Sequence, residues 1–150
     1  MKALFINGSP RKDGNTARLA RALFGSRQYE TLNLTEYRIN AYGQTLPGDQ
    51  FDAVLEKMKE ADVLVIGSPV YWHNICGSIR NLLDRFYGPV PTGSMKGRTL
   101  YFLFQGGAPE KWMLDAGKFT MSRFARLYGM EWGGMAETEA EAAALGSHLG

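Results

Sequence analysis

Five short segments of the chain, three of them mostly apolar, have the length and pattern of β-strands. They span residues 2–6, 28–34, 62–66, 98–104 and 130–135. The segment at 62–66 is an uninterrupted apolar run after its first residue, a pattern typical of a strand that is buried on both faces of a parallel sheet. The hydrophobic pattern therefore predicts five strands.

Stretches with helical character fill the intervals between these segments. Residues 15–24, 51–58, 75–86 and 112–128 carry apolar side chains at helical spacing, and residues 137–145 are rich in Ala and Glu. Gly25 and Gly129 follow the first and fourth stretches, where glycine commonly ends a helix. Residues 36–48 contain Tyr, Asn, Gly and Pro without any period, so we expect a loop there.

This regular alternation predicts an α/β fold. Short apolar strands that alternate with helices form a parallel sheet with helices on both faces, and right-handed crossovers leave few topologies. A length of 150 residues fits one domain, residues 1–150. Ligands of such sheets bind beyond the carboxyl ends of the strands. The loops after residues 6, 66 and 104 are therefore the places to look for a site.

The loop after the first predicted strand has the composition of a phosphate site. Ser9, Asn15 and Thr16 supply short polar side chains, and Arg11 supplies a planar, permanently charged fork of donors. The helix that follows adds free N–H groups and the positive end of its dipole. The simpler alternative is a Gly/Pro turn in which Asn15 or Thr16 only caps the helix.

Three known phosphate motifs are absent from this loop. Five residues separate Gly8 from Gly14, and Asn15 stands where a Walker loop has Lys. Gly8 is followed by Ser9 and Pro10, which excludes the G-x-G-x-x-G fingerprint of dinucleotide-binding proteins. A phosphatase with a cysteine nucleophile is excluded too, because the loop contains no Cys.

Two further loops suggest that the other end of the ligand is flat and partly apolar. Residues 67–75 bring together apolar and aromatic groups, and residues 104–109 contain a Gly-Gly pair that lets the backbone approach a ligand. The candidate ligand residues are Pro69, Val70, Tyr71 and Trp72 in one loop and Gln105, Gly106 and Gly107 in the other. The alternatives are a hydrophobic loop packed on its own helix or on a second subunit, and a plain Gly-Gly turn.

Four other residues with polar or reactive side chains are interpreted as structural. His73 is expected to make packing or hydrogen-bonding contacts rather than to act as an acid or base, and Cys76 is expected to belong to the core. Asp84 and Arg85 are expected to pair and to hold the helix to the sheet or to a second subunit. No catalytic side chain and no metal site is predicted.

Composition narrows the functional classes. Hydrophobic residues make up 45% of the chain and charged residues 21%, which excludes a disordered, collagen-like or coiled-coil protein. A net charge of +2 gives no indication of nucleic-acid binding and argues against an acidic electron carrier. A single Cys, no long apolar run and no visible signal peptide predict a cytoplasmic protein without a membrane partner.

The motifs resemble those of the NAD(P)H-dependent FMN reductase family of flavodoxin-like proteins. The resemblance rests on F-I-N-G-S-P-R-K-D-G-N-T-A at residues 5–17, G-S-P-V-Y-W at 67–72 and S-I-R-N-L-L-D-R at 78–85. It implies a flavodoxin-like sheet with strand order 2-1-3-4-5 and one bound FMN. It also implies a homodimer or homotetramer. Some relatives carry a cysteine cluster between the second and third strands, and residues 35–48 contain no Cys, so we expect no iron–sulfur cluster.

The resemblance also assigns the three loops to parts of FMN. Residues Ser9, Arg11, Asn15 and Thr16 would hold the phosphate, the group at residues 69–72 would lie along the ring, and residues 105–107 would meet its polar edge. The implied reaction passes hydride from NAD(P)H through FMN to a quinone, free flavin, nitro or azo compound, or metal oxyanion. A flavodoxin-type electron carrier and a flavin-free phosphate-binding module are the alternatives.

Overall fold

A computed structural model describes residues 1–149 of the chain. The strands are β1 (Ala3–Asn7), β2 (Glu30–Asn33), β3 (Val63–Tyr71), β4 (Asn74–Ile75), β5 (Thr99–Gln105) and β6 (Glu131–Ala136). The helices are α1 (Asn15–Phe24), the 3₁₀ turn η1 (Leu34–Glu36), α2 (Phe51–Glu60), α3 (Gly77–Phe86), α4 (Lys111–Leu127) and α5 (Glu139–Gly146). No helix in this part of the chain is both long and apolar enough to span a membrane.

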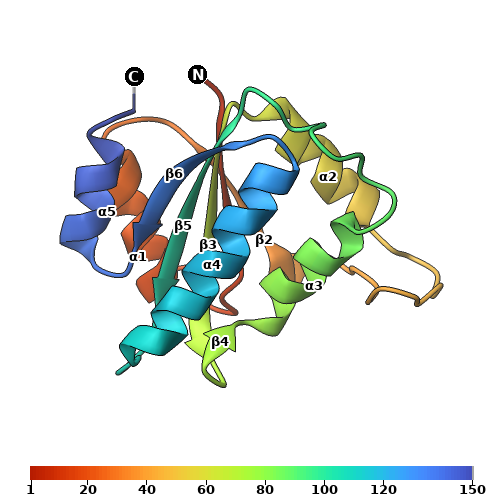
Figure 1. The fold of residues 1–150 in the computed structure, drawn as a ribbon, viewed down its shortest axis with the longest axis horizontal. Coiled ribbons are helices and arrows are strands. Elements are labelled where there is room, and N and C mark those ends of the chain that lie inside the picture. Colours follow the sequence, from red (N-terminus) through yellow and green to blue (C-terminus); the bar gives the residue numbers. More distant parts are fainter. Residues whose placement is uncertain (150) are drawn as a thin grey trace.

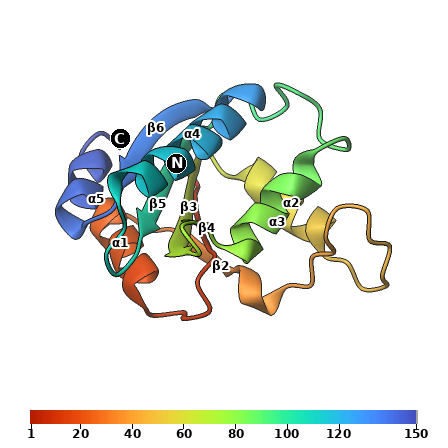
Figure 2. The same ribbon diagram turned by 60° about the horizontal axis from the view of Figure 1, so that its bottom comes forward.

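Five parallel strands form the sheet in the order β2-β1-β3-β5-β6. In chain order these are strands 2-1-3-4-5, so the predicted flavodoxin-like topology is confirmed. The sixth strand, β4, has two residues and pairs in antiparallel fashion with the end of β3, which the sequence did not predict. Figure 1 shows the carboxyl ends of the strands at its lower edge, and Figure 2 turns this edge toward the viewer.

The helices cover the two faces of the sheet unequally. α1 and α5 lie on one face, and α2, α3 and α4 lie on the other (Figures 1 and 2). Successive residues of β1 supply both cores, since Phe5 packs under α1 while Leu4 and Ile6 face the three-helix side. Because both faces are covered, the central strands are largely apolar, as the hydrophobic pattern indicated.

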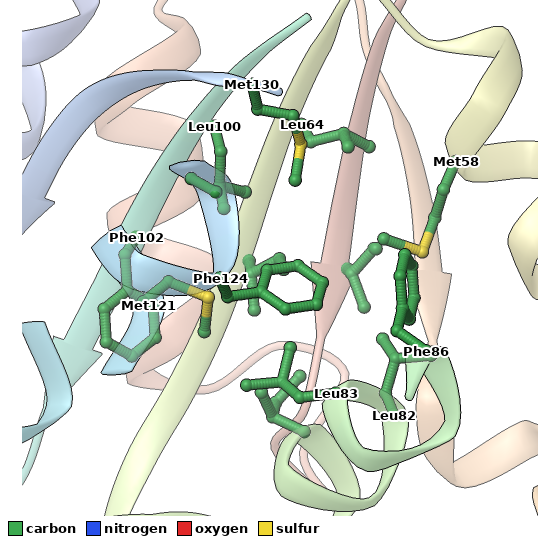
Figure 3. Close-up of a cluster of buried hydrophobic side chains, with 14 of the residues drawn as sticks. Met58, Leu64, Leu82, Leu83, Phe86, Leu100, Phe102, Met121, Phe124 and Met130 are labelled. Atoms are coloured by element: carbon green, nitrogen blue, oxygen red, sulfur yellow. The ribbon is translucent and has the colours of Figure 1, made fainter. Parts of the chain in front are cut away.

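Phe86 lies at the centre of the larger core. Its ring centroid is 4.9 Å from that of Phe124, 5.1 Å from that of Tyr128 and 5.7 Å from that of Phe51. It therefore joins the end of α3 to α2 and α4, and Figure 3 shows its side chain beside Leu82 and Met58. Edge-to-face contacts of this kind add to the stabilisation that burial of the rings already provides.

The third strand is longer than predicted. Residues 67–71 were expected in a loop, but they continue β3, where Gly67, Ser68 and Pro69 pair in register with the end of β5. Gly and Pro indicate a turn when the sequence is read locally. Pairing with β5 on one side and β4 on the other overrides that local signal, and the chain turns only at Trp72 and His73.

Candidate functional site

Asn7, at the end of β1, determines the shape of the first loop. Its buried side chain accepts a hydrogen bond from Ser9 N at 3.1 Å through Oδ1. Through Nδ2 it donates to Arg11 O at 3.1 Å and to Asn33 Oδ1 at 3.0 Å. One amide thus ties the first half of the loop together and to the neighbouring strand β2. The sequence alone does not reveal this role of Asn7, because its partner Asn33 is distant in the chain.

The other side of the loop is fastened to α3 and β3. Gly8 N donates to Gly67 O at 2.9 Å, and Gly8 O accepts from Ser78 Oγ at 2.8 Å. A Cβ on Gly8 would collide with the side chain of Ile79, so only glycine allows α3 to approach this closely. Ser78 is a second residue of the site that sequence reasoning missed.

The first turn of α1 has backbone N–H groups without a partner in the protein. Gly14 is its N-cap residue and provides no side-chain cap, and the first turn contains no acidic residue. Among residues 1–149, the backbone N–H groups of residues 15–17 donate no hydrogen bond within the protein. N–H groups at the start of a helix, together with the dipole, form a site for an anion.

Arg11 adds a positive charge beside these donors. Its neighbours Lys12 and Arg21 form ion pairs with Glu36 at 3.1 Å and Asp13 at 2.7 Å. Arg11 is exposed and has no such partner within the part of the chain that the structure describes. Its guanidinium is therefore available to an anion at the start of α1.

Three of the predicted phosphate residues have other partners in the protein. Ser9 is buried, and its Oγ accepts from Arg11 N at 3.1 Å, so the hydroxyl closes the loop. Thr16 is also buried, and its Oγ1 accepts from Gln105 Nε2 at 3.3 Å. Asn15 is exposed, and its Oδ1 accepts from Arg18 Nη1 at 3.1 Å. The Thr16–Gln105 bond joins the first loop to the loop after β5.

A tight hairpin stands where the second ligand loop was predicted. Trp72 and His73 connect β3 to β4 with positive φ values of 48° and 66°. Two consecutive residues of this kind form a type I′ turn, which normally takes Asn-Gly. Trp72 is 91% exposed and Tyr71 is 47% exposed, so neither side chain serves the core.

The hairpin and the loop after β5 enclose a cavity of about 300 Å³, which we call the ring cavity. It is lined by Val70, Trp72 and His73 from the hairpin side and by Gly106, Gly107, Ala108, Pro109 and Met113 from the other side. A Cβ on Gly106 would press on Val70, whereas the space above Gly107 is open. Among the described residues, the N–H groups of both glycines lack an acceptor.

The predicted ligand residues thus divide into two groups. Val70, Trp72, Gly106 and Gly107 line the ring cavity, with Pro69 and Gln105 paired just behind it, whereas Tyr71 does not line it. Ser9, Arg11, Asn15 and Thr16 gather at the start of α1. Both groups lie at the carboxyl ends of the central strands, where the sheet changes direction between β1 and β3.

His73 and Cys76 have the surroundings of structural residues. The imidazole centroid of His73 lies 5.9 Å from the ring centroid of Trp112, whose Nε1 donates to Glu110 Oε2 at 2.7 Å. Cys76 is buried in the core, as predicted, and its Sγ lies 3.5 Å from Gly8 O. In residues 1–149, no three His, Cys, Asp or Glu side chains gather in a way that could hold a metal ion.

Arg85 does not pair with Asp84, contrary to expectation. Its guanidinium bonds to both carboxylate oxygens of Asp49 at 2.9 and 2.7 Å and to Asn40 O at 2.9 Å. Asp84 instead lies 3.8 Å from Arg80 Nε. Arg85 therefore holds the loop at residues 37–50 against α3, because the approach of this loop places a better partner near it than its neighbour in the chain.

The Asp49–Arg85 pair should make the free energy of unfolding depend on pH. The hydrogen bond from Arg85 lowers the pKa of the Asp49 carboxyl from 3.8 to about 2. The pair should therefore stabilise the fold above pH 4 and lose this effect as the pH falls toward 2. We expect Asp49→Asn to lower the free energy of unfolding by about 1 kcal/mol at pH 7, since solvent screens this pair. Urea denaturation at pH 7, 4 and 2.5 measures the difference, which should shrink with acid. A difference that is constant across this range would contradict the assignment.

One family model and several curated proteins match the chain. The model of the family described as NADPH-dependent FMN reductase matches residues 1–113. An iron–sulfur flavoprotein of Archaeoglobus fulgidus is 38% identical over 98 residues, covering 57% of this chain and 48% of the relative. A Bacillus subtilis protein named as an NAD(P)H-dependent FMN-containing oxidoreductase is 30% identical over 94 residues, covering 57% and 52%.

A solved structure supports the fold over the whole chain. The Trp repressor binding protein of Bacillus subtilis superposes with a TM-score of 0.76, at 20% identity, over 99% of this chain and 98% of its own. At this identity the likeness concerns the fold alone. The chain spans about half the length of the curated relatives it matches.

Proposed function

Since the chain belongs to the NADPH-dependent FMN reductase family, we propose that residues 1–150 form a single FMN-binding domain that passes hydride from NAD(P)H through FMN to a small acceptor. The observation that supports this most is the pairing of free helix donors and an unpaired Arg11 with an aromatic cavity at the same edge of the sheet. FMN likewise carries a phosphate at one end and a flat ring at the other.

The residues present fit FMN in their chemistry. The N–H groups of residues 15–17 at the start of α1 and the Arg11 guanidinium suit a phosphate dianion, which is a strong acceptor. The ring cavity combines apolar walls with two free N–H groups at Gly106 and Gly107, which suits a heterocycle with one polar edge. Open space above Gly107 leaves room for such an edge.

The reaction asks little acid–base chemistry of the protein. When bound, FMN supplies the acceptance and donation of hydride. The chain then has three tasks: the start of α1 and Arg11 neutralise the phosphate, Val70 and Trp72 orient the ring, and the N–H groups of Gly106 and Gly107 stabilise negative charge at its edge. No catalytic side chain is proposed, and His73 keeps its packing role.

The residues around the ring cavity indicate which class of electron acceptor it suits. Trp72 and His73 line the cavity, and Trp112 packs against His73 outside it. None of the residues that line the cavity is Lys or Arg, and nearby Lys111 is paired with Asp115 at 2.6 Å. Among the acceptors the family resemblance allows, these surroundings favour uncharged planar aromatics, such as quinones and nitro compounds, over metal oxyanions.

Visible absorption before and after FMN addition, followed by NADPH and NADH consumption, tests the proposal. A yellow protein that oxidises either nucleotide in the presence of a quinone supports it. A yellow protein that oxidises neither nucleotide is instead an electron carrier. A protein that stays colourless after reconstitution is a phosphate-binding module.

We propose three further properties of the protein. Self-association as a homodimer or homotetramer follows from the family resemblance, and a cytoplasmic location follows from the single Cys of the chain. We also propose that this chain carries no iron–sulfur cluster, because the four thiolates that such clusters use exceed its one cysteine, Cys76. Iron analysis of the purified, FMN-loaded protein checks the last of these.

A further inference from the structure

A second cavity at the carboxyl edge of the sheet lies between the starts of α1 and α5, and we call it the α1–α5 cavity. Figures 1 and 2 show these two helices side by side on the same face of the sheet. The cavity has a volume of about 180 Å³, below the range of pockets that enclose a whole drug-sized ligand, so it suits one part of a larger molecule. Its polar lining comes from Asn15 and Arg18, from Gln105 at the end of β5, and from Glu137, Thr138 and Glu139.

The two sides of the α1–α5 cavity carry opposite charges that are not paired with each other. Arg18 is exposed and donates to Asn15 Oδ1 at 3.1 Å, which holds its guanidinium near the start of α1. In residues 1–149 Arg18 forms no ion pair, and neither does Glu137 or Glu139. One side of the cavity therefore offers a cation, and the other offers two carboxylates, which accept hydrogen bonds but donate none.

The start of α5 is closed to anions by side chains of the protein itself. Thr138 Oγ1 accepts from Glu141 N at 3.2 Å, and Glu141 Oε1 accepts from Glu137 N at 2.9 Å and from Thr138 N at 3.2 Å. This capping box occupies donors that an anion at the start of the helix would need. The α5 side of the cavity thus suits the hydroxyl groups of a ligand, whereas the Arg18 side suits a phosphate.

The α1–α5 cavity adjoins the ring cavity through the end of β5. Gln105 lines the first cavity, and the next two residues, Gly106 and Gly107, line the second. Consecutive Cα atoms are about 3.8 Å apart, so one extended ligand can span the two cavities. Gln105 Nε2 also donates to Thr16 Oγ1 at 3.3 Å, which holds this side chain toward α1. A molecule with a ring at one end and a sugar phosphate at the other therefore matches the pair of cavities.

We propose that the α1–α5 cavity binds the adenosine ribose of the hydride donor and that this donor is NADH. The inference rests on the proposed function, in which the nicotinamide must reach the ring cavity. Arg18 binds the pyrophosphate that joins the two nucleosides. Glu137 and Glu139 accept hydrogen bonds from the ribose hydroxyls, as an acidic residue does in dinucleotide-binding proteins that use NAD.

The same carboxylates discriminate against NADPH. NADPH carries a phosphate on the 2′ oxygen of this ribose, and Glu137 and Glu139 repel that group. The capping box leaves no compensating donor at the start of α5 from the N–H groups that it occupies. The chain therefore prefers NADH, although the family is described by its dependence on NADPH.

Calorimetric titration of the FMN-loaded chain with ADP-ribose and with 2′-phospho-ADP-ribose tests the inference, because neither fragment contains a nicotinamide. The wild-type chain is expected to bind ADP-ribose about tenfold more tightly than the phosphorylated fragment, or better. Glu137→Gln/Glu139→Gln is expected to lower this ratio to about threefold or less, since amides do not repel phosphate and can donate to it. Glu131→Gln changes an exposed acid at the other end of β6 and is the matched control, which should keep the wild-type ratio.

Arg18 variants test the cationic side of the cavity at saturating FMN. Arg18→Ala is expected to weaken the binding of both fragments about fivefold or more, and Arg18→Lys is expected to recover part of the loss, because it keeps the charge without the fork of donors. In steady-state assays with one quinone, the preference for NADH in kcat/KM should follow the order of the titrations and lie mostly in KM. Far-UV circular dichroism and the visible flavin spectrum confirm that each variant is folded and loaded.

Three results would overturn the inference: no binding of ADP-ribose, tighter binding of the phosphorylated fragment, or a ratio that the double Glu→Gln variant leaves unchanged. They are expected if Arg18 closes the cavity by pairing with Glu137 or Glu139 in solution. A chain that binds ADP-ribose as described but oxidises neither NADH nor NADPH would instead contradict the proposed function, so the two failures are distinguishable.

Discussion

The double variant Arg11→Ala/Asn15→Ala is expected to bind FMN roughly 30- to 1,000-fold more weakly than the wild type. Charge-assisted hydrogen bonds contribute about 1.5–3 kcal/mol each, and removing two groups from one phosphate is expected to cost about 2–4 kcal/mol in total. Arg11 is the larger contributor, because its guanidinium has no ion-pair partner within the described chain. Fluorescence titration of the purified apoprotein with FMN gives both dissociation constants.

Arg21→Ala is the matched control for this measurement. Arg21 lies in α1, as Asn15 does, but its guanidinium forms an ion pair with Asp13 at 2.7 Å. Its loss should change the affinity for FMN less than about threefold, which is the scale of an exposed ion pair. If the double variant binds FMN as tightly as this control does, the phosphate lies somewhere other than the start of α1.

Phe86→Ala is expected to lower the free energy of unfolding by about 3–5 kcal/mol. Phe86 is fully buried and contacts three other rings, from α2, α4 and the end of α4, so its removal leaves a cavity that no single neighbour can fill. Such a loss is a large fraction of the stability of a typical domain. Urea denaturation followed by far-UV circular dichroism measures it.

The exposed residue Leu46 provides the comparison for this variant. Leu46→Ala removes an apolar side chain that is 58% exposed in the loop at residues 37–50, so its expected cost is within about 0.5 kcal/mol. A Phe86→Ala cost as small as that would mean that α3 does not depend on this ring for its position.

The sequence was most informative where a local signal, such as a helix-ending glycine, coincides with the end of an apolar periodic pattern. The bounds of α1 were predicted without error, because apolar residues at helical spacing end at Gly25, which has a positive φ of 61° and closes the helix. The order of the parallel strands followed from the family resemblance and from the covered faces that the apolar runs indicate. The predicted loops after β1 and β5 lie at the carboxyl edge, whereas residues 67–71 of the second predicted loop extend β3.

The sequence was least informative where a partner comes from far along the chain. Asn7 could not be recognised as the organiser of the first loop, because its role depends on Asn33 in another strand. The same limit applies to Arg85, whose partner Asp49 lies 36 residues away. The hairpin after β3 was missed because Gly and Pro suggest a loop, whereas the pairing that extends the strand is set by β5.

The network around Asn7 also bears on the thermodynamics of ligand capture. A loop that must order itself around a ligand loses roughly 1–2 kcal/mol of backbone entropy for each residue that becomes fixed. Here Asn7, Ser9 and Ser78 already restrain the turn from three directions through bonds within the protein. Binding should therefore cost little conformational entropy of the loop, because the loop already has the conformation that the ligand needs.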